Sequence, residues 1–124
     1  MRIAEVAERY DLSTDTLRYY EKAGLIPRVA RTESGIRDYD ENACAAVEFV
    51  KCMRGANVSI DALARYVKLL EQGDATLEER KAILVEQRKA AQAQLDRIQA
   101  GLDRLDYKIA NYDKLIASAA CTMR

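Results

Sequence analysis

Apolar residues recur every three or four positions along most of this chain, which predicts a protein built mainly of α-helices. The first 73 residues divide into four short helical segments, at 3–10, 13–23, 40–54 and 59–72. Each of the last three begins with a residue that favours a helix N-cap and is followed closely by a glycine. These pairs are Ser13 with Gly24, Asp40 with Gly55, and Ser59 with Gly73.

The segment after the second helix carries a different pattern, too short and too polar for another helix. Pro27 prevents the second helix from continuing, and Ser34 with Gly35 forms a favourable turn. We therefore expect two short strands, at 28–29 and 37–39, joined through that turn. A helix followed by a small basic β-wing is an arrangement suited to gripping a DNA groove and the phosphates beside it.

The C-terminal part of the chain predicts one long helix from Thr76 to about Ser118, because no proline and a single glycine interrupt it. A capping box, with Thr76 as N-cap and Glu79 reaching back, is expected at its start. Large apolar residues alternate at spacings of three and four over its last three heptads, which indicates a coiled-coil seam. The seam residues are Leu95, Ile98, Leu102, Leu105, Ile109, Tyr112 and Ile116. Self-association is favoured over packing of this helix on its own domain.

Charge and composition narrow the class of protein only a little. The chain has 124 residues, 49% of them hydrophobic, with 20 basic and 20 acidic residues. Net charge therefore does not indicate a nucleic-acid partner, although residues 13–37 hold five basic and three acidic side chains. No apolar run approaches the roughly 20 residues of a membrane helix, and the N-terminus does not resemble a signal peptide. We expect a cytoplasmic protein without membrane contact.

The chain has no histidine, and its three cysteines include no CxxC pair. This removes the commonest general base and the commonest metal ligand. An odd number of cysteines also argues against a disulfide framework. No nucleophile–base pair, glycine-rich phosphate loop or paired-carboxylate arrangement stands out. We therefore expect neither an enzyme nor a bound cofactor or metal.

The order of these motifs resembles the MerR family of bacterial transcription regulators. The matching segments are LRYYEKAGLIP, RTESGIRDYD and a helix ending in MRGANVS, between Ile3 and about Gly73. The resemblance implies a mainly all-α fold, with a winged helix-turn-helix and small two-stranded wing at 1–73. A long dimerisation helix at 74–124 would form an antiparallel coiled coil with a short C-terminal tail. It further implies a homodimer that distorts a pseudo-palindromic promoter for RNA polymerase.

The same resemblance implies which residues contact DNA. Arg18 and Tyr20 match operator contacts of the recognition helix, with Tyr19 between them, and an arginine can fork onto guanine or a phosphate. Arg31 and Arg37 match wing residues that bind phosphates, Tyr39 matches a residue that shapes the wing, and Arg54 matches a second phosphate contact. The full expected set is Ser13, Thr14, Thr16, Arg18, Tyr19, Tyr20, Arg31, Arg37, Tyr39 and Arg54.

Two of these residues have a structural alternative. Helix spacing places Tyr20 beside Leu17, so that Tyr20 could belong to the core. Arg37 could simply pair with Asp38 or Asp40, which follow it closely in the chain.

Cys52 is the candidate sensor. The segment from EFVKCM onwards resembles a branch of the family that responds to aldehydes and thiol-oxidising stress through one cysteine at this position. Lys51 and Arg54 flank Cys52, and cationic neighbours favour the thiolate that attacks electrophiles. The C-terminal end of a helix disfavours that charge, so a buried, inert cysteine remains the alternative. Cys44 and Cys121 are expected to be structural or incidental.

Other hypotheses stay open at this point. One is a DNA-distorting regulator that senses nothing through its thiols, and another is a helical adaptor that binds protein. A metal sensor is disfavoured, because no cysteine lies at the start of the long helix and only Cys121 lies beyond the seam. No drug-binding domain is expected after the coiled coil.

Overall fold

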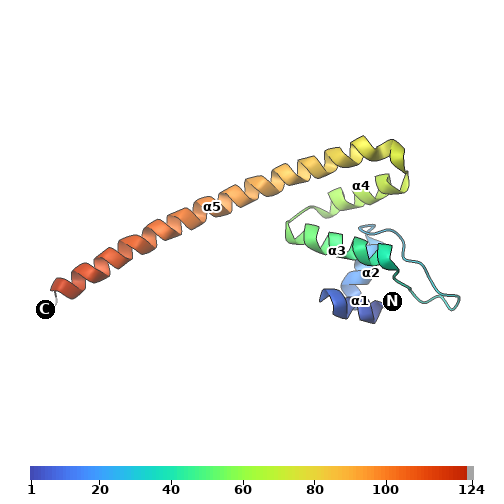
Figure 1. The fold of residues 1–124 in the computed structure, drawn as a ribbon, viewed down its shortest axis with the longest axis horizontal. Helices are drawn as coiled ribbons and strands as arrows, with labels where there is room; N and C mark the ends of the chain where they lie inside the picture. The colour runs from blue at the N-terminus through green and yellow to red at the C-terminus, as the bar shows by residue number, and fades with distance from the viewer. Residues whose placement is uncertain (123–124) are drawn as a thin grey trace. The chain divides into compact units, whose positions relative to one another are not determined.

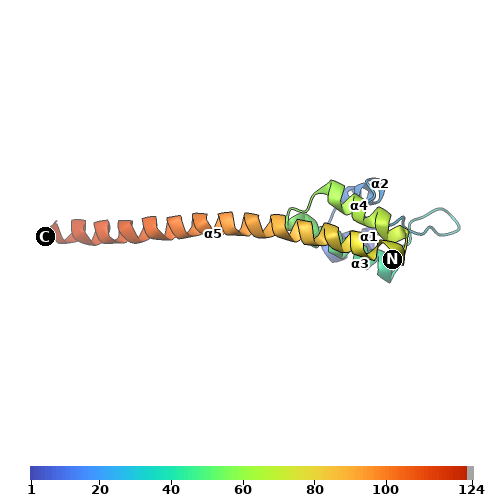
Figure 2. The same cartoon turned by 90° about the horizontal axis from the view of Figure 1, so that it is seen from above.

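The computed structural model describes residues 1–122 and is mainly helical, which confirms the predicted fold class (Figure 1). Its helices are α1 (Ile3–Tyr10), α2 (Thr14–Lys22), α3 (Glu41–Gly55), α4 (Ile60–Glu71), the short 3₁₀ helix η1 (Asp74–Thr76) and α5 (Leu77–Thr122). The chain divides into two compact units, Met1–Arg88 and Lys89–Arg124. Helix α5 begins in the first unit and supplies the second, and it runs without a break (Figure 2).

Short polar side chains determine where α2, α3 and α4 begin, as predicted. Ser13, Asp40 and Ser59 each accept a hydrogen bond from the backbone N–H three residues further on, at 3.0, 2.8 and 3.1 Å. Gly24 and Asn57 adopt positive φ values of 72° and 64°, so the chain leaves α2 and α3 through left-handed backbone. Helix α2 is therefore bounded at both ends by its own local sequence.

One apolar core holds the first unit together. Val47 and Val50 of α3 are buried in this core, whereas Met53 is only partly buried. Ile83 joins the same core from the first turns of α5. The segment between α2 and α3 also contributes, which anchors the base of the wing. The largest fully buried side chains are Tyr39, Leu17, Leu25, Ile26, Val6, Val29, Val47 and Val50.

The predicted capping box at the start of the long helix is wrong. Thr76 is only 4% exposed, and its hydroxyl lies 2.7 Å from the carbonyl oxygen of Leu69 and 2.8 Å from that of Gly73. The Nε–H of Arg80 donates to the same hydroxyl at 3.0 Å. Carbonyl groups at the end of a helix lack partners within the helix. Thr76 therefore satisfies the end of α4 instead of capping α5.

The predicted two-stranded wing forms a hairpin without regular strands. Within residues 1–122, one isolated antiparallel bridge pairs Arg31 with Arg37, and a backbone hydrogen bond of 2.8 Å flanks it on each side. The strand expected at 28–29 does not form. Its backbone is engaged elsewhere, because the Val29 N–H donates to the side chain of Glu21 at 2.7 Å.

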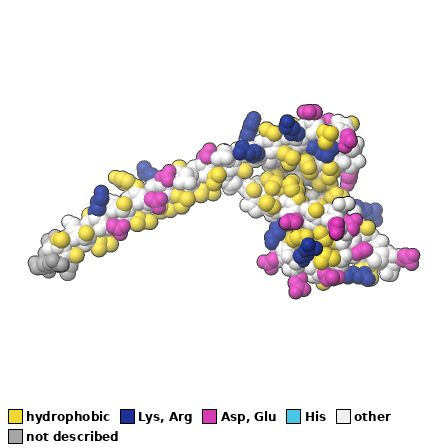
Figure 3. Space-filling view, viewed as in Figure 1, with side chains coloured by type: hydrophobic (Ala, Val, Ile, Leu, Met, Phe, Trp, Pro, Cys, Tyr) yellow, Lys and Arg dark blue, Asp and Glu magenta, His cyan; other side chains and the backbone are white. Residues whose placement is uncertain are grey.

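The second unit exposes large apolar side chains. The predicted seam residues are between 48% exposed, at Leu102, and 65% exposed, at Ile116. Figure 3 shows hydrophobic side chains gathered along one edge of this helix. Even so, no helix of residues 1–122 combines the length and the apolar character needed to cross a membrane.

Candidate nucleic-acid interface

Helix α2 separates its buried residues from a polar, exposed face. Leu17 is completely buried, whereas the side chain of Arg18 is 49% exposed and Tyr19 is 46% exposed. The N-terminal turn of the helix adds hydroxyl groups to the same face. The predicted DNA contacts that reach the surface on this helix are Ser13, Thr14, Thr16, Arg18 and Tyr19.

Arg18 is held only loosely within the protein. One of its Nη groups donates to the Asp15 carboxylate at 3.1 Å and lies 3.4 Å from the hydroxyl of Thr14. The Asp15 side chain is 93% exposed, so this ion pair lies in water. Exposed pairs of this kind contribute about 0–1 kcal/mol. Arg18 can therefore exchange Asp15 for a base edge or a phosphate at little cost.

Tyr20 and Tyr39 lie in the core, where they are 7% and 1% exposed. Burial raises the pKa of both hydroxyl groups. The Tyr39 hydroxyl is buried without a hydrogen-bond partner among the described residues. The Tyr20 ring therefore belongs to the core, which is the alternative that helix spacing indicated. The burial of Tyr39 fits a role in shaping the wing but not a direct DNA contact of its hydroxyl. The DNA contact expected of Tyr20 stays a prediction.

Glu21, in the last turn of α2, joins this helix to the wing. Its Oε1 accepts hydrogen bonds from Arg37 Nε at 2.9 Å and from Arg31 Nη2 at 3.2 Å. Its Oε2 accepts from the Val29 N–H at 2.7 Å. Arg37 thus pairs with a residue of α2 instead of with its acidic neighbours in the chain. One carboxylate therefore contacts both limbs of the hairpin.

The surroundings of Glu21 keep it ionised at neutral pH. Burial raises the pKa of this carboxyl, since its side chain is only 10% exposed. The hydrogen bonds from Arg37 and Val29, together with the positive charges of Arg31 and Arg37, outweigh burial and leave the pKa below its ordinary value.

The end of α3 carries the candidate sensor. Cys52 is a free, exposed cysteine, which excludes the alternative of a buried one. Its cationic neighbours bind backbone oxygens: Lys51 Nζ donates to the carbonyl of Tyr10, and Arg54 Nη1 donates to that of Val58 at 2.6 Å. The first contact joins the end of α3 to α1, and the second lies within the turn between α3 and α4. Cys52 thus lies between a long-range contact and a local turn contact of the first unit.

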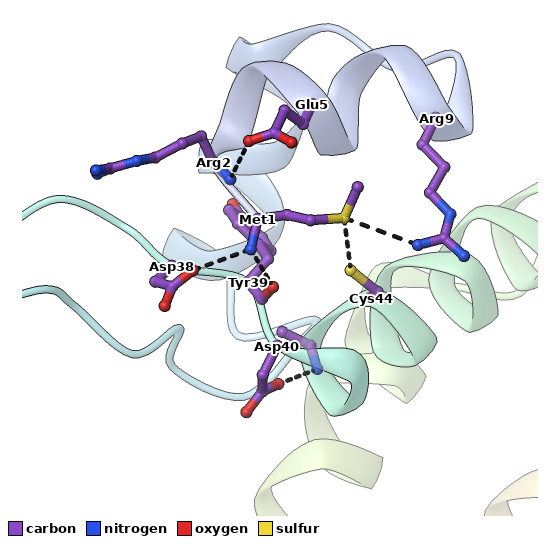
Figure 4. A network of polar contacts seen from close by, with 9 residues as sticks. Met1, Arg2, Glu5, Arg9, Asp38, Tyr39, Asp40 and Cys44 are labelled. Atoms are coloured by element: carbon purple, nitrogen blue, oxygen red, sulfur yellow. Dashed lines mark hydrogen bonds and ion pairs between the residues drawn. The ribbon is translucent and has the colours of Figure 1, made fainter.

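A network around Met1 fixes the returning limb of the wing (Figure 4). The Met1 amino group donates to the Asp38 carboxylate at 2.9 Å and to the Tyr39 carbonyl at 2.8 Å. The Tyr39 N–H donates back to the Met1 carbonyl at 2.7 Å. Cys44 is buried with its Sγ 3.8 Å from the Met1 sulfur, whereas Cys121 is exposed on α5. Cys44 therefore belongs to the packing of α3 against the N-terminal residues.

Comparison with known proteins places this arrangement in a family. The family model described as MerR family regulatory protein matches residues 2–39. A solved MerR family transcriptional regulator from Listeria monocytogenes is 43% identical, with 91% of this chain and 86% of that chain covered and a TM-score of 0.89. This chain belongs to the MerR family. It is a DNA-binding transcription regulator, and the relatives compared are regulators, not enzymes.

Two further relatives bear on what this MerR-family chain does. The crystal structure of HiNmlR, described as a MerR family regulator lacking the sensor domain and bound to promoter DNA, is 33% identical, with 94% of this chain and 92% of that chain covered and a TM-score of 0.82. The HTH-type transcriptional regulator AdhR of Bacillus subtilis is 55% identical over 80 residues. That match covers 64% of this chain and 57% of AdhR, less than two thirds of the relative.

Proposed function

We propose that this MerR-family regulator binds a pseudo-palindromic promoter as a homodimer and distorts the duplex to control transcription by RNA polymerase. The observation that carries the proposal is the exposed apolar seam from Leu95 to Ile116 on the second unit. Large exposed apolar surfaces mark interaction sites, and a three-four spacing fits a two-stranded coiled coil. The antiparallel orientation follows from the family resemblance.

A dimer of this kind would present two copies of the α2 face and the wing. An isologous dimer has a two-fold axis, which is why its operator repeats a half-site in opposite orientation. Within each half-site, Arg18 would contact base edges while Arg31, Arg37 and Arg54 would contact phosphates. The similarity to HiNmlR over most of both chains supports this use of the first unit.

Distortion of the promoter is energetically within reach of such a dimer. Bending a DNA site of the length that such a dimer contacts costs on the order of a few kcal/mol. Phosphate contacts from the first unit of each chain can offset this cost. Because the target is a promoter, we place the protein in the cytoplasm. The proposal requires no cofactor.

Distortion can be measured on a duplex that the wild-type protein selects from a random-sequence library, called here the selected duplex. With fluorescent dyes at its two ends, we expect binding to shorten the end-to-end distance. In closed circular DNA carrying the same site, we expect a change in linking number if the duplex is also untwisted. Unchanged end-to-end distance together with unchanged linking number would contradict the proposed distortion.

We further propose that Cys52 senses aldehydes or related electrophiles. The thiol is exposed, and the EFVKCM segment resembles the aldehyde-responsive branch of the family. Addition of the sulfur to an aldehyde carbon opens the carbonyl π bond and leaves the thiol proton on the oxygen, so the hemithioacetal forms without an oxidant. The added group would crowd the end of α3, where Lys51 contacts α1 and Arg54 contacts the turn before α4.

Replacing Cys52 by Ser should abolish the response to an aldehyde such as formaldehyde in a promoter-reporter strain, while basal DNA binding stays at the wild-type level. Serine keeps the size of the side chain but is a far weaker nucleophile than a thiolate. Cys121→Ser is the matched control, because Cys121 is also exposed but lies outside the first unit. A Cys52→Ser protein that responds as strongly as wild type would favour the second candidate, a MerR-type regulator without thiol sensing.

A further inference from the structure

We infer that Glu21 is a positioning residue that aligns Arg31 and Arg37 for DNA phosphates, so that an acidic side chain strengthens DNA binding. The inference rests on the proposed function, because it takes the two wing arginines as phosphate contacts. We expect the loss of the Glu21 charge to weaken DNA binding. This direction is unusual, since removal of a negative charge near a phosphate backbone ordinarily tightens binding.

The arginines need a partner because of where the hairpin places them. Arg31 and Arg37 form the antiparallel bridge of the wing, directly opposite one another. Like charges at opposed positions destabilise such a pair. The Glu21 carboxylate lies within hydrogen-bond distance of both guanidinium groups, at 3.2 and 2.9 Å, and offsets one of the two charges. The hairpin can therefore keep two adjacent cations on one edge.

The bonds to Glu21 leave donors available for DNA. Arg37 gives Glu21 its Nε–H, and Arg31 gives it an N–H of Nη2. Each guanidinium carries further N–H groups in the same plane, and a phosphate can use these. The Arg31 and Arg37 side chains are 31% and 27% exposed, so their outer edges remain accessible. An arginine held in place at one edge loses less conformational entropy when it binds a phosphate with the other.

Glu21 also couples the two DNA-contacting parts of the first unit. It belongs to α2, and its second oxygen accepts the Val29 N–H at the base of the wing. The same carboxylate therefore fixes the wing relative to the helix that carries Arg18. Its repulsion of phosphate is screened by salt, with a Debye length of about 10 Å at 0.1 M, whereas the partly buried ion pairs that align the arginines are screened much less.

The test is the affinity of full-length Glu21→Gln for the selected duplex, measured over a range of salt concentrations. We expect binding weakened by on the order of tenfold or more, with a shallower dependence on salt, because each lost phosphate contact lowers the slope by about 0.9. Glu33→Gln is the matched control, since Glu33 lies exposed in the turn of the same hairpin and its replacement removes the same charge. We expect that control to bind as tightly as wild type or more tightly. Equal or tighter binding by Glu21→Gln would overturn the inference.

A second experiment, in a protein that lacks both wing arginines, separates a positioning role of Glu21 from a general structural role. In a protein with Arg31→Ala and Arg37→Ala, the further change Glu21→Gln should cause no additional loss of affinity. An equal loss in that background would show that Glu21 acts through the fold instead, and would overturn the inference. If Glu21→Gln does not fold, as judged by its melting temperature, Glu21→Asp keeps the charge but shortens its reach. We then expect weakened binding, and wild-type affinity would overturn the inference.

The same experiments distinguish the inference from the proposed function. If Arg31→Ala with Arg37→Ala leaves binding and its salt dependence unchanged, the wing contacts of the proposed function fail, and the inference fails with them. If that double variant binds weakly while Glu21→Gln binds as wild type, only the inference fails.

Discussion

Leu105→Asp is expected to convert the protein to monomers at micromolar concentration and to weaken binding to the selected duplex by about 100-fold or more. Leu105 lies in the middle of the apolar seam and is 60% exposed in the single chain. In the paired state, aspartate would be buried against apolar side chains without a partner, at a cost of several kcal/mol for each copy. Every 1.4 kcal/mol corresponds to about a tenfold change in an equilibrium constant. Light scattering and a gel-shift titration measure the two effects.

Tyr107→Asp controls for the introduction of a charge into the same helix. Tyr107 is 76% exposed and lies two positions after Leu105, on the far side of the helix from the seam. This variant should remain a dimer and bind DNA as wild type does. If Leu105→Asp stays dimeric, the seam residues do not form the interface and the proposed pairing is wrong.

Arg18→Ala is expected to remove most of the preference for the selected duplex over a scrambled one. A bidentate arginine–guanine contact discriminates by about 1–3 kcal/mol at each base pair, and a dimer makes the contact twice. The preference should therefore fall by about 30-fold or more, whereas binding to the scrambled duplex should weaken much less. Competition titrations with both duplexes measure the ratio. A preserved ratio would show that Arg18 does not contact bases.

Arg65→Ala provides the matched control for that experiment. Arg65 pairs with Asp61 at 3.2 Å on the surface of α4, just as Arg18 pairs with Asp15 on α2. Its side chain is 53% exposed, close to the 49% of Arg18. Loss of an exposed arginine from α4 should leave both the affinity and the preference unchanged.

Local sequence signals predicted the helices well, because their physical causes are local. A side-chain cap acts within three residues, and a glycine or asparagine at positive φ ends a helix where it stands. The caps at Ser13, Asp40 and Ser59 therefore formed as predicted. The recognition-helix face followed from the same signals, because helix periodicity fixes which side chains point away from Leu17.

Contacts between distant residues account for most of the corrections. Thr76 has the composition of an N-cap, yet its hydroxyl serves the carbonyl of Leu69, seven residues earlier. Glu21 stands within the RYYE motif, but its partners lie eight to 16 residues later, at Val29 and Arg37. No local pattern indicates such pairs. The Met1 network, which spans 38 positions, was missed for the same reason.

The tyrosines show a different limit of sequence-based prediction. Helix periodicity alone correctly indicated that Tyr20 could belong to the core, while the family resemblance indicated a DNA contact. Tyr39 follows the wing directly, and only the three-dimensional structure shows that it belongs to the apolar core. A tyrosine suits either place, because its ring is apolar and its hydroxyl is polar.

We propose above all that two copies of this chain act together on one duplex. Sedimentation of the purified protein at micromolar concentration, alone and with the selected duplex, tests it most directly. We expect a particle of twice the 14.0 kDa chain mass without DNA, and two chains on each duplex with it. A single 14.0 kDa chain in both conditions would contradict it.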